Sequence, residues 1–350
     1  MRQFLPLAIV LVITICSLIL SLGSGSMGIG IDEICSLYLH SGEQSGFGLV
    51  NSTNAPAGTA VASLDGAHEK RRGMRRAVFE KIRLPRVVAA FLGGAILAAA
   101  GAVFQCLLRN PLADPYVLGI SAGGAVGAVT AMALGFTSIS MVAGASFAGA
   151  LATMMIVLII SRRNQSSNSM LLAGVMINAT LSSLISLLVY FAPRVKSVMF
   201  WLMGSFSGNT WTSVMFMGFS AMLLGTVIFL ASPWMDCLAM GETTAQSLGV
   251  PVRRLKVILF LISSAATAIV VAFCGVIGFA GMVIPHFSRA LVGSSHRMMV
   301  PVCFLAGGAF MCLADTISRT ALSPEELPIG IVTGIIGGPL FIYILTRRAQ

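Results

Sequence analysis

The chain has 350 residues, of which 57% are hydrophobic and 10% are charged, and its formal net charge is +10. Its mean hydropathy is +0.93. Because soluble domains carry about 25% charged residues, this composition excludes a soluble enzyme with a single apolar hairpin. We therefore expect a membrane protein.

Apolar segments recur along the whole chain, and most are about long enough to cross a hydrocarbon core of about 30 Å as helices. In chain order they are residues 4–22, 87–108, 117–134, 141–160, 170–191, 211–231, 257–273, 276–292, 300–317 and 329–345. Gly275 and Gly278 divide one long apolar stretch, because glycine permits a tight turn. The pattern predicts an all-α, polytopic membrane protein with about ten transmembrane helices.

The first apolar segment has two interpretations, because Arg2 precedes it as in a cleaved signal peptide. Its apolar run is longer than that of a usual signal peptide, and residues 24–26 only loosely resemble a cleavage site. Ile15, directly before Cys16, argues against a lipoprotein site. We expect residues 1–22 to be retained as the first transmembrane helix, followed by a long outer loop (23–86) and a transmembrane core (87–350).

Positive charges in the short loops indicate the orientation of the chain. With the N-terminus inside, the inner loops hold eleven basic residues: Arg2, Arg109, Arg162, Arg163, Arg253, Arg254, Lys256, Arg289, Arg297, Arg347 and Arg348. The short outer loops hold three: Arg194, Lys196 and Arg319. This bias follows the positive-inside rule, so both termini are predicted to lie inside.

A basic cluster in the long loop contradicts this orientation, since it would lie outside. It comprises Lys70, Arg71, Arg72, Arg75, Arg76, Lys81, Arg83 and Arg86. Long loops translocate largely regardless of charge, so the short loops decide. Residues 70–76 are read as a solvated or headgroup-facing segment, whereas Arg83 and Arg86 flank Pro85 at a helix mouth and suit an acidic partner surface. No aromatic residues are interleaved for nucleic-acid binding.

The sequence contains no recognisable source of energy. Beyond Arg86 it has six acidic residues, all near helix ends or loops, and His286 is interpreted as a packed residue instead of a proton relay. No Walker-type phosphate loop is present. The seven cysteines are scattered singly and predict neither disulfides nor a metal site. Either a partner supplies the energy, or the protein is a passive channel.

Glycine spacing predicts close helix packing. Gly123-x-x-x-Gly127 and Gly334-x-x-x-Gly338 are small-residue spacings that allow two membrane helices to approach closely.

Several motifs then occur in order between residues 82 and 345. They are Arg83-Leu84-Pro85-Arg86, Asn110-Pro111-Leu112-Ala113-Asp114-Pro115 followed by Leu118-Gly119-Ile120-Ser121, Glu242-x-x-Ala245-x-x-Leu248-Gly249, Gly278-Phe279-x-Gly281-x-Val283-x-Pro285-His286, Ala314-Asp315, and Glu326-Leu327-Pro328-Ile329-Gly330. Together they resemble the permease subunits of ABC importers for iron–siderophore complexes and vitamin B12. Residues 23–81 carry no motif of that family, and their role is unassigned.

The resemblance implies ten helices per subunit, with two permeases enclosing a central path; it leaves open whether the second permease is identical. It implies two cytoplasmic ATP-binding subunits and an extracytoplasmic substrate-binding protein as partners. The cytoplasmic loop near 235–252 would couple to the ATPase through Glu242, Ala245, Leu248 and Gly249. On the residues alone, that loop is equally an ordinary connector with a short helix between Gly241 and Gly249.

The same resemblance assigns residues at the two ends of the path. Arg83, Arg86 and Arg319 would dock acidic residues of the binding protein, and Asn110 and Leu112 would help close an inner gate. Independently, Asp315 and Arg319 are one helical turn apart and are predicted to pair. As an exposed pair they would contribute about 0–1 kcal/mol, so recognition is the better reason for the charge.

The leading hypothesis is a permease that moves an iron(III)-siderophore, or a related iron chelate or haem, across the cytoplasmic membrane of a prokaryote. Residues 200–208 resemble the iron-complex members more than the vitamin members. Import of vitamin B12 is the alternative, and a gradient-driven carrier is a remote one. ATP hydrolysis is expected on a separate subunit, so we predict no catalytic residues, metal or cofactor in this chain.

Overall fold

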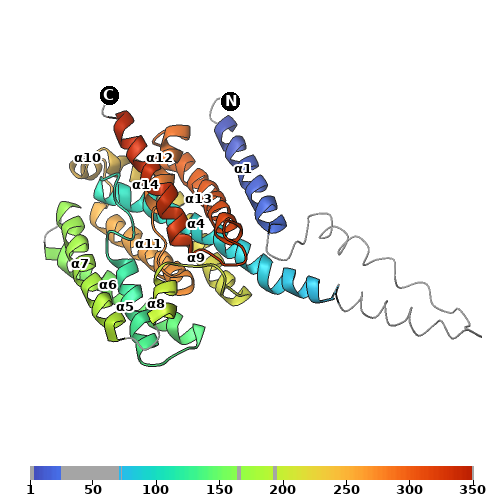
Figure 1. The fold of residues 1–350 in the computed structure, drawn as a ribbon. Helices are drawn as coiled ribbons and strands as arrows, with labels where there is room; N and C mark the ends of the chain where they lie inside the picture. Colours follow the sequence, from blue (N-terminus) through green and yellow to red (C-terminus); the bar gives the residue numbers. More distant parts are fainter. Residues whose placement is uncertain (1–3, 25–70, 72, 164–166, 192–194, 349–350) are drawn as a thin grey trace, which may run out of the picture.

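The computed structural model describes residues 4–24, 71, 73–163, 167–191 and 195–348, which form a bundle of helices (Figure 1). Within these ranges no residue belongs to a β-strand, which confirms the predicted all-α class. Residues 25–70 and 72, most of the predicted outer loop, lie outside the described residues.

The longer helices follow the predicted apolar segments closely. They are α1 (Phe4–Gly23), α4 (Leu84–Leu108), α5 (Ile120–Ala133), α6 (Ile139–Arg163), α7 (Ser167–Phe191), α9 (Trp211–Ala239), α11 (Val252–Cys274), α12 (Ala280–Val292), α13 (His296–Thr320) and α14 (Ile329–Arg348). Seven helices in the described ranges are long and apolar enough to cross a membrane. The predicted break between α11 and α12 is confirmed, and two short helices, α8 (Val195–Leu202) and α10 (Glu242–Ser247), complete the bundle.

The start of α4 differs from the prediction, which ended the outer loop at residue 86. Residues 73–78 are helical, and Phe79–Arg83 form one π-helical turn, η2, that runs directly into α4. Pro85 lacks an N–H and cannot donate to the carbonyl four residues earlier. The wider turn accommodates this loss, since the backbone N–H of Leu84 bonds to Phe79 O instead. The motif at 83–86 therefore lies within a continuous helix.

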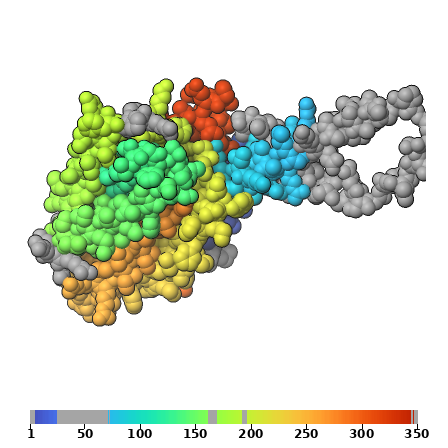
Figure 2. Space-filling view, turned by 90° about the horizontal axis from the view of Figure 1, so that it is seen from below, coloured from blue at the N-terminus to red at the C-terminus, as the bar shows by residue number. Residues whose placement is uncertain are grey.

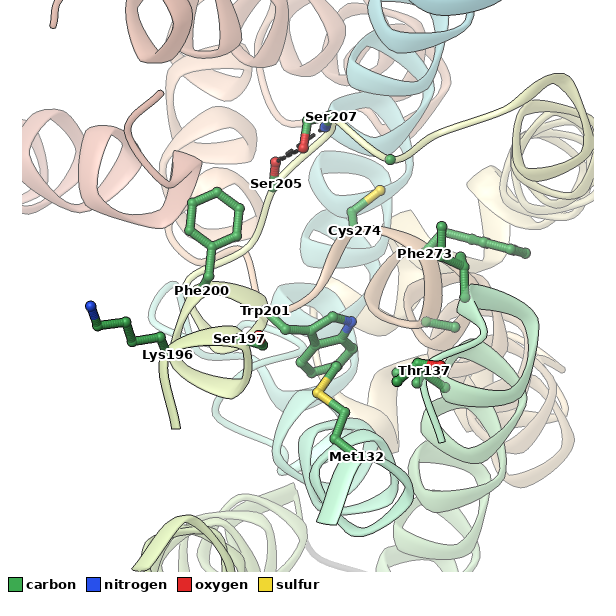
Figure 3. Close-up of a pocket in the computed structure, with 14 residues that line it drawn as sticks. Met132, Thr137, Lys196, Ser197, Phe200, Trp201, Ser205, Ser207, Phe273 and Cys274 are labelled. Carbon is green, nitrogen blue, oxygen red and sulfur yellow. Dashed lines mark hydrogen bonds between the residues drawn. The ribbon is translucent and has the colours of Figure 1, made fainter. Parts of the chain in front are cut away.

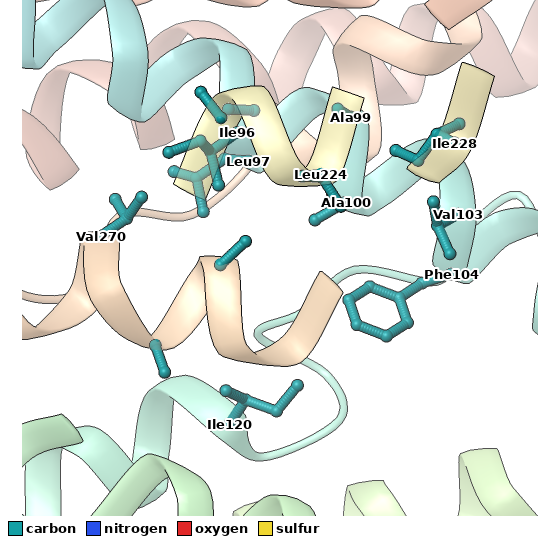
Figure 4. Close-up of a cluster of buried hydrophobic side chains, with 14 of the residues drawn as sticks. Ile96, Leu97, Ala99, Ala100, Val103, Phe104, Ile120, Leu224, Ile228 and Val270 are labelled. Carbon is teal, nitrogen blue, oxygen red and sulfur yellow. The ribbon is translucent and has the colours of Figure 1, made fainter. Parts of the chain in front are cut away.

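α4 is the central helix of the bundle, and 83% of its most apolar window is buried inside the chain. It packs against α9, α11, α12 and α13. Figure 4 shows side chains of α4 meeting Leu224 and Ile228 of α9 and Val270 of α11. Phe104 of α4 meets Phe260 edge to face, with ring centroids 5.9 Å apart. This burial holds both ends of α4 in fixed positions relative to its neighbours.

Small residues allow the closest contacts, as expected where apolar burial gives little drive between helices in lipid. A Cβ on Gly94 of α4 would overlap the Gly307 carbonyl of α13. The prediction for Gly123 and Gly127 is confirmed, because a Cβ on either would overlap α6. Within the described part of this chain, Gly334 and Gly338 do not make the predicted close contact: a Cβ on either would lie at an ordinary distance from the Phe279 ring, 3.8 and 4.0 Å. The tight positions of α14 are Gly330, where a Cβ would overlap the Met203 carbonyl, and Gly337, where it would lie 2.6 Å from Phe279 Cβ.

The bundle has two distinct ends. The start of α1, the end of α14 and the short helix α10 lie on one side of the molecule (Figure 1). The end of α1, the start of α4 and the start of α14 lie on the opposite side. Figure 2 views the molecule from this second side.

Candidate functional site

Three of the predicted site residues form a charged cluster at the second end of the bundle. We call Arg83, Arg86, Asp315, Arg319 and Glu326 the arginine cluster. Arg83 is the last residue of η2 and Arg86 lies in the first turn of α4. Asp315 and Arg319 come from the last turns of α13, and Glu326 from the loop before α14. The fold thus brings together residues about 230 positions apart: the Arg86–Asp315 contact spans 229.

Arg86 is the centre of this cluster. Its Nε donates to Asp315 Oδ1 at 3.0 Å, and its Nη1 donates to both carboxylate oxygens of Glu326, at 2.8 and 3.0 Å. The side chain of Arg86 is only 9% exposed. Two carboxylates therefore occupy its fork, an arrangement in which charge-assisted hydrogen bonds are strong.

The predicted Asp315–Arg319 pair is confirmed, but the expectation that it would be exposed was wrong. Arg319 Nε lies 3.0 Å from Asp315 Oδ2, and the two side chains are 6% and 1% exposed. Arg319 also donates to the backbone carbonyls of Ser24 at 2.6 Å and Ser21 at 2.8 Å. α1 packs against α13 at this end and shields the pair from solvent. The two hydrogen bonds from Arg319 attach the end of α1 to α13.

Arg83 differs from the other two arginines in what it contacts. It is 7% exposed and close enough to Arg319 for the two guanidinium groups to repel one another. In the cluster, Asp315 pairs with both Arg86 and Arg319, and Glu326 pairs with Arg86. One of these carboxylates, Glu326, keeps 37% of its side chain exposed, whereas Asp315 is buried.

A second group of predicted residues lies at the opposite end, on and around α10. Ala245 is completely buried and anchors the helix, while Leu248 is 61% exposed. Gly249 has a φ of +81°, in the left-handed region that favours glycine, so the chain turns sharply here into α11. The predicted short helix between Gly241 and Gly249 is confirmed.

Glu242 in the first turn of α10 connects this helix to its neighbours. Lys256 Nζ of α11 lies 2.6 Å from Glu242 Oε1, and Arg109 Nη2 lies 3.7 Å from the same oxygen. Arg109 directly follows α4 and adopts a left-handed backbone with a φ of 48°. The carboxylate therefore joins α10 to the C-terminal end of α4, a contact that sequence reasoning did not identify.

The predicted gate residues lie in the turn that begins at Arg109. Asn110 Oδ1 accepts a hydrogen bond from the backbone N–H of Leu112 at 2.9 Å, which closes an Asx turn. Leu112 is 42% exposed. Asn110 thus shapes the turn, and the turn presents an exposed leucine beside the contact between α4 and α10.

Two cavities lie next to α8 and the residues that follow it. One of about 530 Å³ is lined by α8 and the residues that follow it (Figure 3). There the Trp201 indole lies over the Met132 side chain, and Ser205 hydrogen-bonds to Ser207 at 2.9 Å. A second cavity of about 410 Å³ is lined by residues that include Asp114, Met203 and Gly330. Much of the segment 200–208, singled out from the sequence, thus lines the first cavity.

In the described part of the chain, no group of three or more His, Cys, Asp or Glu residues is arranged to hold a metal ion. The two charged groups described above, around Arg86 and around Glu242, instead lie at opposite ends of α4.

Comparison with known proteins gives a consistent family. Residues 11–347 match the model of the FecCD transport family. The chain is 39% identical to the uncharacterized ABC transporter permease protein YvrB of Bacillus subtilis, over 95% of this chain and 90% of that protein. It is 42% identical to the cobalamin import system permease protein BtuC of Halobacterium salinarum, over 76% of this chain and 73% of that protein.

A solved structure gives the same result. It is described as an inward-facing conformation of a metal-chelate type ABC transporter, and it is similar to this chain with a TM-score of 0.78 and 29% identity. The similarity covers 97% of each chain. In this family the permease crosses the membrane and separate subunits hydrolyse ATP. The chain is therefore a member of the FecCD transport family, a multi-pass permease subunit of an ABC importer.

Proposed function

We propose that this permease moves an iron(III)-siderophore, or a related iron chelate, across the cytoplasmic membrane of a prokaryote. The observation that carries the proposal is the similarity, over 97% of both chains, to a metal-chelate type transporter. The aromatic segment at the cavity beside α8 adds support, since a wide apolar pocket with few polar groups suits a bulky chelate. Import of vitamin B12 is the second candidate, favoured by the relatives named for cobalamin import.

The proposed topology has ten membrane helices with both termini in the cytoplasm. Seven long helices, together with the shorter α5, α12 and α14, give this number. The start of α1 and the end of α14 share one side of the bundle with α10 (Figure 1). The arginine cluster at the other end then faces outward. Residues 1–22 and 87–350 make up the membrane part, and residues 23–81 remain without an assigned role.

α10 is the proposed coupling element, which two cytoplasmic ATP-binding subunits would move. Its exposed Leu248 and sharp turn at Gly249 present a short, ordered projection that suits a groove on a soluble partner. The contact of Glu242 with Arg109 supplies a physical route from this helix to the inner gate at Asn110 and Leu112.

The arginine cluster is the proposed docking surface for a substrate-binding protein with acidic residues. Three arginines at one end of the bundle supply the complementary charge. Because Arg86 and Arg319 are buried and paired, the charge that they present depends on Asp315 and Glu326. Replacing Arg83 by glutamine is a cleaner test of docking than reversing the charge of Arg86, which would place a third carboxylate beside two others.

A second permease, identical or different, would complete the path along α7. Only 6% of the most apolar window of α7 is buried inside this chain. Thr180, Ser183 and Ser186 on this helix are exposed, and each donates to the carbonyl four residues earlier. The hydroxyls are satisfied by the helix's own carbonyls, so the support for a second subunit at α7 is that this helix packs so little within its own chain.

Transport by the reconstituted complex tests the function. Vesicles containing the permease, its ATP-binding subunits and its binding protein should take up a ferric siderophore with ATP present and the proton gradient collapsed. Uptake that stops with the gradient would establish a gradient-driven carrier instead. Cobalamin should compete poorly; efficient cobalamin uptake with no ferric chelate uptake would replace the leading substrate with the alternative.

A further inference from the structure

Glu326 differs from every other member of the arginine cluster, because it is both paired and partly open to solvent. Its two carboxylate oxygens accept from Arg86 Nη1 at 2.8 and 3.0 Å, yet 37% of its side chain is exposed. Asp315, the other carboxylate on Arg86, is 1% exposed and also holds Arg319. Only Glu326 is therefore in a position to leave Arg86 without stranding a buried charge.

Each of the three nitrogens of the Arg86 guanidinium lies against a carboxylate of this chain. Its Nε and Nη2 face Asp315, and its Nη1 faces Glu326. Because the Arg86 side chain is only 9% exposed, an incoming carboxylate competes for this guanidinium with the two carboxylates already beside it. Since Asp315 is enclosed and Glu326 lies at the surface, exchange at Nη1 is the open route.

The segment that carries Glu326, residues 326–330, continues to the wall of the 410 Å³ cavity. Leu327 N donates to Ser318 O at 3.0 Å, and Ile329 N donates to Gly204 O at 3.0 Å. Gly330 N then donates to Met203 O at 2.9 Å. Met203 and Gly330 both line the 410 Å³ cavity. Glu326 is thus four residues along the chain from Gly330 in the wall of that cavity.

We propose that Glu326 is an internal substitute for the partner's carboxylate: an acidic residue of the docking protein displaces it from Arg86 and loosens the segment 326–330 beside the cavity. This inference rests on the proposed docking of an acidic binding protein at the arginine cluster. It adds that the partner's carboxylate exchanges with Glu326 on Arg86. Glu326 is then a positioning residue, because its displacement changes the segment 326–330 that reaches the cavity.

A neutral variant of Glu326 gives an unusual expectation, because removing a residue from the docking surface should strengthen docking. Glu326→Gln takes away the competitor for Arg86, so the purified substrate-binding protein of the same transport system should bind the complete transporter more tightly. A partly exposed ion pair implies a gain of about twofold to fivefold. Binding is measured by surface plasmon resonance on transporter held in nanodiscs, at a fixed salt concentration.

The matched control is the neighbouring Glu325→Gln. It removes the same single charge from the same loop, but the structure gives Glu325 no ion pair with any described residue. Both variants reduce long-range repulsion of an acidic partner equally, so only the exchange separates them. Equal tightening by the two variants, or weaker binding in Glu326→Gln, would overturn the proposal.

Hydrogen exchange supplies a second readout, in which the change on docking in the wild type distinguishes carboxylate exchange from a purely structural ion pair. In the wild-type transporter, docking should speed exchange at the amides of Ile329 and Gly330; in Glu326→Gln that exchange should already be fast without the partner. Unchanged exchange at both amides in the variant would contradict the proposal.

The Arg83→Gln variant distinguishes failure of docking at the arginine cluster from failure of the carboxylate exchange at Glu326. If it binds as well as wild type, docking at the cluster fails; if it binds weakly while Glu326→Gln and Glu325→Gln behave alike, only the exchange fails.

Discussion

Replacing Asp315 by asparagine removes the most buried charge of the arginine cluster while keeping the shape of the side chain. In the wild type this carboxylate, 1% exposed, accepts from Arg86 and lies 3.0 Å from Arg319 Nε. The asparagine oxygen can still accept one hydrogen bond. Among its described partners, Arg319 would then keep only neutral groups, the carbonyls of Ser21 and Ser24 and the hydroxyls of Ser21 and Thr316, and Arg86 would keep Glu326.

The expected cost follows from burial. Removing one partner of a buried ion pair typically costs about 3–5 kcal/mol, because the other charge is left uncompensated. Since Arg86 retains Glu326, we expect Asp315→Asn to lie near the lower end, about 3 kcal/mol. Glu326→Gln removes a carboxylate that is 37% exposed from the same arginine, and should cost only about 0–1 kcal/mol.

The free energy of unfolding is measured for both variants by equilibrium denaturation in mixed micelles. A second substitution gives an internal check: adding Arg319→Gln to Asp315→Asn removes the uncompensated cation and should recover part of the loss. If Asp315→Asn costs no more than Glu326→Gln, burial of the cluster does not control its energetics, and the reasoning fails.

Three further outcomes are expected from the coupling end and the core. Gly249→Val should leave ATP hydrolysis intact but lower uptake per ATP, because a left-handed backbone costs a residue with a side chain roughly 1–2 kcal/mol; normal uptake would argue against coupling at α10. Glu242→Gln should lower uptake per ATP by about twofold to fivefold. Adding Arg109→Gln should lower uptake per ATP no further. If the losses of the two single variants multiply in the double variant, the two residues act independently. Gly94→Leu should reduce the yield of folded protein in detergent, measured by size-exclusion chromatography, whereas Gly144→Leu, which has open space around it, should not. Equal yields would show that α4 and α13 tolerate a wider separation.

The helices could be predicted from the sequence because apolar length is a local signal that the membrane imposes directly. The break between α11 and α12 followed from Gly275 and Gly278 for the same reason. The start of α4 was predicted too late in the chain, because Pro85 suggests a helix mouth, whereas the turn before it widens and the helix continues through it. That adjustment depends on backbone hydrogen bonds, and the residue types alone do not specify it.

The charged contacts divide in the same way. The Asp315–Arg319 pair is one helical turn long and was predicted. The contacts of Arg86 with Asp315 and of Arg109 with Glu242 join distant helices, so no spacing in the sequence indicates them. The exposure of Asp315 was mispredicted because α1 covers it, and the position of α1 is set by tertiary packing alone.

The arginine cluster and the Glu242–Arg109 contact lie at the two ends of the same helix, α4. Arg86 lies in its first turn and Arg109 directly follows its last, while the helix between them is almost wholly buried. A packed helix moves as a unit, so a shift that ATP imposes on α10 through Glu242 should alter docking at Arg86. Coupling between two binding events is reciprocal. We therefore expect ATP to change the affinity of the wild-type transporter for its binding protein, and Glu242→Gln to reduce that change. An ATP effect of the same size in Glu242→Gln would show that α4 does not carry the coupling through this contact.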